Sequence, residues 1–181
     1  MRKLVCLFAL LLLATLPMAA QDTPKVEVSA HYSYARVNPD IGDSVNLNGG
    51  GGSVAFNANN WFGVVGEFNF YKMGKIGGVD PEASIITYLF GPRISFRGNE
   101  RWTPFVHGLF GGARASSSFA GASGSESAFA MAFGGGFDAK VSEHVAVRVA
   151  QVDYFITRFD EGSGKVNQNG FRYSGGIVFR F

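Results

Sequence analysis

Apolar and polar residues alternate along much of this chain, which is the pattern of a two-faced β-strand. Residues 26–36 show it most clearly, because valine, alanine and tyrosine there alternate with glutamate, serine and histidine. Residues 171–181 repeat it and end on an aromatic residue, Phe181. Successive side chains of a strand point to opposite faces. Each such segment is therefore predicted to be a strand with one apolar face and one more polar face.

Eight segments of this kind are separated by residues rich in glycine, proline and asparagine, which favour turns. The predicted strands are residues 26–36, 47–57, 61–72, 84–96, 102–113, 128–139, 145–159 and 171–181. The connections alternate between short ones, near 57–61, 97–101 and 140–144, and long ones, near 37–47, 73–83, 114–127 and 160–170. This arrangement predicts an all-β fold: an eight-stranded antiparallel transmembrane β-barrel with short periplasmic turns and longer extracellular loops.

The seventh predicted strand breaks the alternation in an informative way. Its outward apolar set ends at Val149 and resumes at Val152, one residue out of step. A β-bulge adds one residue to one strand of a pair and so restores a common face. We expect a bulge near Ala150, which keeps both Arg148 and Gln151 on the inner side.

The first 20 residues have the pattern of a secretory signal peptide. Arg2 and Lys3 form a positive start, residues 4–16 are apolar, and small residues lead to a cleavage site after Ala20. The apolar stretch is shorter than the roughly 20 residues that a membrane-spanning helix needs. We therefore expect a cleaved signal peptide, residues 1–20, followed by a single barrel domain, residues 21–181.

Composition narrows the function classes further. Cys6 is the only cysteine and lies in the predicted signal peptide, so disulfides, thiol catalysis and thiolate metal sites are not expected in residues 21–181. Those residues carry 14 basic and 14 acidic side chains, which removes the electrostatic case for a nucleic-acid partner. Aromatic residues make up 14% of the chain. A barrel explains this abundance, because its apolar surface is spread over alternate positions.

Charged residues on the inward parity form the strongest candidate site. They are Glu27, Glu67, Arg93, Asp138, Arg148, Asp153 and Arg172. An eight-stranded barrel is just wide enough for side chains to fill it, and buried charges must pair. We expect a plug of salt bridges in which Arg93 and Arg148 neutralise the inward acids Glu67, Asp138 and Asp153. The alternative is a narrow polar route that opens when the pairs exchange partners.

Other candidate chemistry is weaker. The histidines His31, His107 and His144 lack metal-ligand spacing, so no metal or other cofactor is expected. His31 and Ser33 lie on one strand face, and a lipid-modifying enzyme could use such a pair. The simpler interpretation is an inward polar pair, since no matching acidic partner is visible.

Several fragments together carry a family resemblance. They are residues 87–93, 104–108, 134–138 and 147–149, followed by Gln151, Asp153 and the terminal Phe181. In this order they resemble the small eight-stranded outer-membrane β-barrels, namely the OmpA membrane domain and OmpX-like proteins. The resemblance implies a location in the outer membrane of a Gram-negative-type bacterium. It also implies an assembly signal formed by Tyr173, Phe179 and Phe181, which the barrel-assembly machinery reads.

Three functional hypotheses follow from these patterns. The first is a non-enzymatic structural or surface-interaction barrel, with outer-membrane lipids, the assembly machinery and a surface ligand bound through the loops as its partners. The second is a narrow pore for small solutes. The third is a lipid-modifying enzyme. A cell-wall-binding domain is not expected, because the chain stops at Phe181.

Overall fold

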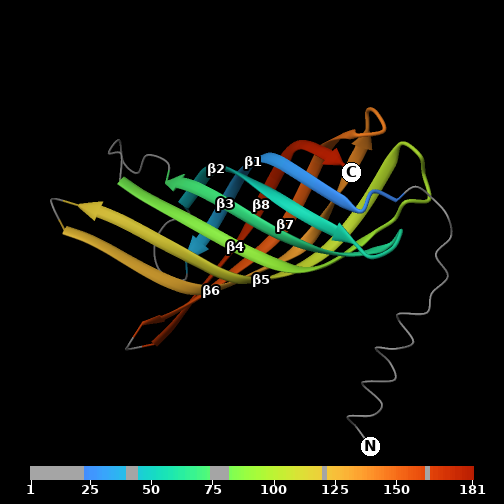
Figure 1. The fold of residues 1–181 in the computed structure, drawn as a ribbon. Coiled ribbons are helices and arrows are strands. Elements are labelled where there is room, and N and C mark those ends of the chain that lie inside the picture. The colour runs from blue at the N-terminus through green and yellow to red at the C-terminus, as the bar shows by residue number, and fades with distance from the viewer. Residues whose placement is uncertain (1–22, 40–44, 74–81, 120–121, 162–163) are drawn as a thin grey trace, which may run out of the picture.

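The computed structural model describes residues 23–39, 45–73, 82–119, 122–161 and 164–181 of the chain, so the predicted signal peptide lies outside the described residues. The strands are β1 (Val26–Pro39), β2 (Val45–Asn57), β3 (Phe62–Met73), β4 (Glu82–Ser95), β5 (Trp102–Phe119), β6 (Ala122–Lys140), β7 (Val145–Glu161) and β8 (Gly164–Arg180). They form a closed barrel in chain order (Figure 1), which confirms the predicted eight-stranded antiparallel fold. Among the described residues, no helix is long and apolar enough to cross a membrane.

The barrel closes by pairing its first and last strands. The β1–β8 ladder runs from Glu27 opposite Arg180 to Pro39 opposite Gln168. Phe181 extends this closure by one residue, because its N–H donates to the carbonyl of Val26 at 2.8 Å and its carbonyl accepts from Val26 N–H at 3.1 Å. Closure leaves neither strand with a free edge over this length, which removes a template for aggregation.

The predicted facing of the side chains is confirmed. Phe90 and Phe129 are 64% and 51% exposed on the outer surface, whereas the adjacent Leu89 and Ala130 are 2% and 0% exposed inside the barrel. The outer surface is a continuous set of aromatic and aliphatic side chains, while most of the buried polar residues face the interior, here called the lumen. An apolar outside and a polar inside are what a barrel in lipid requires.

Short turns stand at one end of the barrel, here called the turn end, and polar side chains hold them. Asn59 Oδ1 accepts from the N–H groups of Trp61 and Phe62, and Asn99 Oδ1 accepts in the same way from Arg101 and Trp102. An asparagine that bonds the backbone two or three residues on is a standard turn device.

The opposite end, here called the loop end, differs from the prediction. Residues 114–127 were expected to form a loop, yet β5 continues to Phe119 and β6 begins at Ala122. Likewise, most of the predicted loop 160–170 belongs to the β8 strand, which begins at Gly164. Ladder hydrogen bonds join backbone groups, so a hairpin can continue through serine and glycine residues that show no apolar alternation.

The predicted bulge in β7 is confirmed. On the β8 side, Arg148 lies opposite Gly176 and Gln151 opposite Ser174, so two residues of β7 occupy the space of one residue of β8. The pairing with β6 shifts at the same height, between Phe137 and Asp138. As a result, Arg148 and Gln151 are both buried in the lumen.

Candidate functional site

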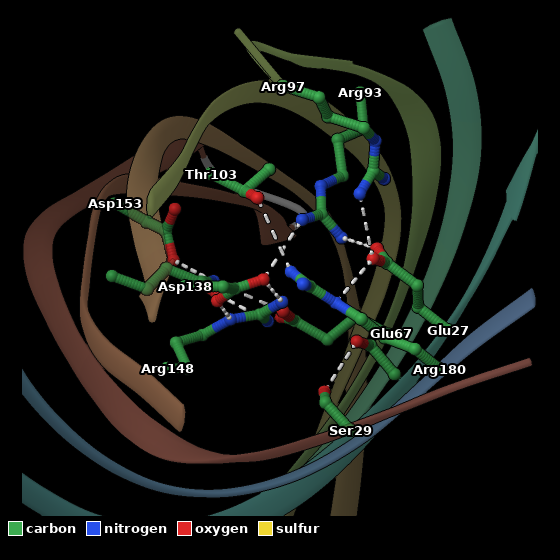
Figure 2. Close-up of polar contacts among 12 residues, drawn as sticks. Glu27, Ser29, Glu67, Arg93, Arg97, Thr103, Asp138, Arg148, Asp153 and Arg180 are labelled. Carbon is green, nitrogen blue, oxygen red and sulfur yellow. Dashed lines mark hydrogen bonds and ion pairs between the residues drawn. The ribbon is translucent and has the colours of Figure 1, made fainter. Parts of the chain in front are cut away.

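A group of six charged side chains fills the lumen near the turn end. This turn-end cluster consists of Glu27, Arg93, Arg97, Asp138, Arg148 and Arg180. They converge on the barrel axis from five strands, β1, β4, β6, β7 and β8, and from the turn after β4, which carries Arg97 (Figure 2). Arg93 is its centre: Nη1 lies 3.1 Å from Glu27 Oε2, and Nη2 lies 3.2 Å from Asp138 Oδ2.

Two arginines complete the surroundings of Glu27. Arg97 Nη1 and Arg180 Nε approach the same oxygen, Oε1, at 3.2 and 3.1 Å. Glu27 therefore serves three guanidinium groups, counting Arg93. Because β1 supplies the carboxylate and β4 and β8 supply Arg93 and Arg180, this junction links the neighbouring strands β1 and β8 to β4 across the lumen.

Asp138 makes the second junction of the cluster. Arg148 Nε donates to Asp138 Oδ1 at 2.9 Å, while Arg93 reaches Oδ2. Both guanidinium groups also stack on the ring of Phe105, at 4.1 Å for Arg93 and 4.7 Å for Arg148. A cation over an aromatic face is stabilised by the ring quadrupole. Gly136 lies beside the ring and cannot carry a side chain, since a β-carbon there would collide with the backbone of Ala150 and Gln151 and lie 3.0 Å from Phe105 Cζ.

A second group lies deeper in the lumen. This mid-lumen cluster consists of Glu67, His107, Gln151, Asp153 and Arg172. Arg172 bridges two carboxylates, with Nη1 2.6 Å from Glu67 Oε1 and Nη2 2.6 Å from Asp153 Oδ2. His107 Nε2 lies 2.7 Å from the other oxygen of Asp153.

Gln151 joins the two clusters. Its Oε1 accepts from Arg148 Nη1 at 3.0 Å, and its Nε2 donates to Asp153 Oδ2 at 2.8 Å and to Glu67 Oε2 at 3.3 Å. The amide therefore connects a cation on one side to carboxylates on the other. The result is one connected polar network that crosses the lumen from Glu27 to Arg172.

The structure places all seven of the charged residues singled out from the sequence in this network, but it pairs them differently. Arg93 and Arg148 were expected to neutralise Glu67, Asp138 and Asp153. Both pair with Asp138, as expected, but Arg172 holds Glu67 and Asp153 instead. The strand order shows which strands are neighbours. It does not give the height of each side chain, which the tilt of the strands decides.

Three contributors were missed in the sequence. Arg180 lies on the inward parity of the last strand, so its alternation was an available signal. Arg97 lies just beyond β4, in a segment that was predicted to be a turn. Phe105 is an apolar residue on a polar face, and only its stacking on two arginines explains it.

The loop-end half of the lumen holds an apolar cluster beside buried polar side chains such as Thr87 and Thr157. Ala35, Leu47 and Tyr71 form a buried cluster, against which Ile85 packs. A cavity of about 30 Å³ lies beside them. Arg172 contributes to its lining, so the cavity adjoins both the apolar cluster and the mid-lumen cluster.

His31 and Ser33 are both buried and face the lumen, and each bonds to a different neighbour. His31 Nε2 lies 2.8 Å from Asn69 Oδ1, and Ser33 Oγ lies 2.7 Å from Ser174 Oγ. Tyr173, Phe179 and Phe181, the expected assembly signal, are all exposed on the outer surface of the closing strand.

A closed barrel with an apolar outer face and an ion-paired lumen defines the class of outer-membrane-type β-barrels. The chain belongs to the outer membrane protein beta-barrel domain family, whose model matches residues 6–181. It is therefore an outer-membrane β-barrel protein.

Solved structures show the same fold. Neisserial surface protein A is 15% identical, with 89% of this chain and 100% of that chain covered and a TM-score of 0.71. Ail of Yersinia pestis is 23% identical, with 87% and 99% covered and a TM-score of 0.58. OprG of Pseudomonas aeruginosa is 12% identical, with 91% and 99% covered and a TM-score of 0.51. None of the curated proteins matches this chain.

Proposed function

We propose that this protein is a non-enzymatic structural or surface-interaction barrel whose lumen is closed by its own side chains. The observation that supports this proposal is the connected network of five arginines and four carboxylates that crosses the lumen. An ion that passed through would have to separate several buried pairs at once. Removing one partner of a buried pair typically costs about 3 to 5 kcal/mol, so the closed state is favoured.

Conductance in a planar lipid bilayer tests closure directly. We expect the wild-type barrel to show no steady conductance, and a variant that removes both Arg93 and Arg148 to show a measurable one. Ser95→Ala, which changes a buried lumen residue outside the network, serves as the matched control and should stay closed. Steady conductance through the wild-type protein would replace this proposal with the narrow pore.

A surface role is supported by the loop-end hairpins. Residues 122–128 of β6 pair only with β5, because the β6–β7 ladder reaches no further than Phe129 opposite Arg158. At the loop end the β5–β6 hairpin thus continues past the last β6–β7 pair, while β5 stays paired with β4 up to Ser118 opposite Glu82 (Figure 1). We propose that this hairpin faces the cell exterior, where it binds a surface ligand.

An epitope inserted between Phe119 and Ala122 tests which side the hairpin faces. Antibody should label it on intact cells, whereas the same epitope between Gly98 and Asn99, at the turn end, should need permeabilised cells. Labelling of the second site on intact cells would mean that the orientation is reversed.

Assembly is proposed to depend on the exposed aromatic residues of β8. Deleting Phe181 also removes two backbone hydrogen bonds to Val26, so loss of insertion must be separated from loss of closure. Phe181→Ala keeps those bonds and should still lower the amount of folded, heat-modifiable barrel in the outer membrane. An unchanged yield of folded barrel would contradict the proposal that Phe181 is part of the assembly signal.

Cleavage of the signal peptide is tested by mass spectrometry. A mature protein that begins at Gln21 would support the proposed cleavage after Ala20.

The lipid-modifying enzyme is the least supported alternative, because His31 and Ser33 are buried and bonded to separate partners. Lipid A mass spectra of a deletion strain should match those of the parent. A missing modification that wild-type protein restores, and His31→Ala protein does not, would favour the enzyme.

A further inference from the structure

The turn-end cluster is not electrically balanced. It contains four guanidinium groups, those of Arg93, Arg97, Arg148 and Arg180, but only two carboxylates, Glu27 and Asp138. Two positive charges are therefore in excess within a mostly buried site. Burying an unpaired charge costs free energy, so an anion that neutralises this excess would stabilise the site.

The mid-lumen cluster offsets only part of this excess. It holds two carboxylates, Glu67 and Asp153, against Arg172 and the imidazole of His107. With His107 neutral, this cluster has one surplus negative charge. The neutral amide of Gln151 lies between the two clusters. At least one positive charge at the turn end remains uncompensated by lumen carboxylates of the described residues.

Arg97 has the donors for an additional ligand. Its Nη1 is paired with Glu27, but its Nε and Nη2 find no hydrogen-bond partner within the described structure. These two nitrogens form the side-on fork with which arginine binds a carboxylate or phosphate through two parallel bonds. The Arg97 side chain is 10% exposed, more than those of the other three arginines, and it comes from the turn after β4. Both unpartnered nitrogens are buried, so the side chain must turn before the fork can meet an entering ligand.

A hollow of about 400 Å³ leads to the cluster from the turn end. Lys140, His144 and Arg180 line it, together with Phe181 and the exposed Glu143. Glu143 forms no ion pair with the cluster among the described residues. Arg180 connects the hollow to the buried site, because the same guanidinium lines the hollow, contacts Glu27 and lies 3.5 Å from Thr103 Oγ1 (Figure 2).

We propose that the turn end of the lumen is a binding site for a phosphate-type oxyanion, held by Arg180 and Lys140 in the hollow and by the fork of Arg97. The anion balances the excess guanidinium charge and offers acceptors to the unpartnered donors. This site does not require the lumen to conduct, because the residues that line the hollow lie at the turn end. It goes beyond the proposed function, because it assigns the barrel a ligand.

Phosphate binding to the refolded full barrel in detergent micelles tests the site. Titration calorimetry with sodium phosphate, at constant ionic strength set with chloride, should give saturable binding of one ion per barrel. Arg97→Gln and Lys140→Gln should each weaken binding by about tenfold, the loss of one charge-assisted contact. Arg101→Gln removes an exposed arginine of the same turn that, unlike Arg97, forms no ion pair with the cluster among the described residues, and it should bind phosphate as the wild type does. Absence of saturable binding, or equal weakening by Arg101→Gln, would overturn the proposal.

A second variant supplies the missing negative charge within the protein. Thr103→Glu places a carboxylate beside Arg180, so it should fold, abolish phosphate binding and remove any rise in melting temperature that phosphate produces. Phosphate binding of wild-type strength in folded Thr103→Glu protein would contradict the site. This variant keeps the test valid if Arg97→Gln does not fold.

The oxyanion could be free phosphate or the headgroup of a neighbouring phospholipid, and nanodiscs distinguish the two. If phosphatidylglycerol nanodiscs without inorganic phosphate raise the melting temperature over phosphatidylcholine nanodiscs, and Arg97→Gln removes the rise, the headgroup is the ligand. If only added inorganic phosphate raises the melting temperature, and Arg97→Gln removes that rise, the free ion is the ligand. No effect of either would exclude the site.

Discussion

The two halves of the lumen are filled in different ways. At the turn end, six charged side chains depend on one another, and each of the two carboxylates serves more than one arginine. At the loop end, Ala35, Leu47 and Tyr71 pack without charge beside a small cavity. Ion pairs fail when one partner is lost, whereas apolar packing weakens in proportion to the contact removed. Substitutions at the turn end should therefore cause large losses of stability, whereas substitutions at the loop end should cause losses that scale with the contact removed.

The largest effect is expected from breaking a pair at the turn end. Arg148→Met should lower the free energy of unfolding in lipid vesicles by about 3 to 5 kcal/mol, because Asp138 loses its bidentate partner. Asp138→Asn in the same chain should recover part of that loss. A double-mutant cycle over urea unfolding measures the coupling.

The pairing seen in the structure gives this cycle an internal control. Arg148 reaches Asp153 only through Gln151, so the cycle of Arg148→Met with Asp153→Asn should show much weaker coupling. Equal coupling in both cycles would mean that the network acts as one unit rather than as separate junctions.

The next largest effect is expected on the outer, lipid-facing surface of the strands, which differs from both halves of the lumen. Val147→Arg places a charge in lipid, but Val147 lies two residues from the turn-end start of β7, so the cost should stay below the value of about 2 to 4 kcal/mol expected at the membrane midplane. Ser95→Ala, a lumen change, should cost much less. If the two variants unfold with equal free energies, Val147 does not face lipid.

The sequence predicted which side chains face outward or inward far better than it predicted which charged side chains form ion pairs. Alternation alone placed Phe129 outside and Ala130 inside, and a break in it located the bulge near Ala150. Pairing was harder, because the height of Arg172 relative to Glu67 follows from strand tilt and not from any local pattern. The loop-end ladders were missed for a related reason: serine and glycine between Ala115 and Ser127 carry backbone hydrogen bonds without showing an apolar face.

A smaller and graded effect is expected in the loop-end half. Leu47→Ala should cost about 2 kcal/mol, the low end for a buried leucine, because the site lies beside an existing cavity near the strand end. Leu47→Met keeps the volume and should cost less than about 1.5 kcal/mol. A loss as large as that of Arg148→Met would show that this half is as cooperative as the turn end.

The smallest effect is expected from a neutral lumen pair. Ser53→Ala removes the 2.7 Å hydrogen bond to Ser29, which Figure 2 shows with Ser29 labelled, and should cost about 1 kcal/mol. Salt should not change this value, because the serine pair is neutral and buried. A salt-dependent cost for Ser53→Ala would mean that the serine pair is coupled to the arginines.

The bulge in β7 has a consequence for how this gene can change length. Residues 149 and 150 together stand opposite the single residue Gly175, so β7 carries one residue more than its neighbour requires. Deleting the codon of Ala150 would leave Arg148 and Gln151 two positions apart, both still facing inward on a regular strand. An in-frame codon loss at this position should therefore be tolerated, while the same loss at Phe133 would turn one half of β6 inside out. At the bulge, therefore, the strand can lose one residue without changing which side chains face the lumen and which face outward.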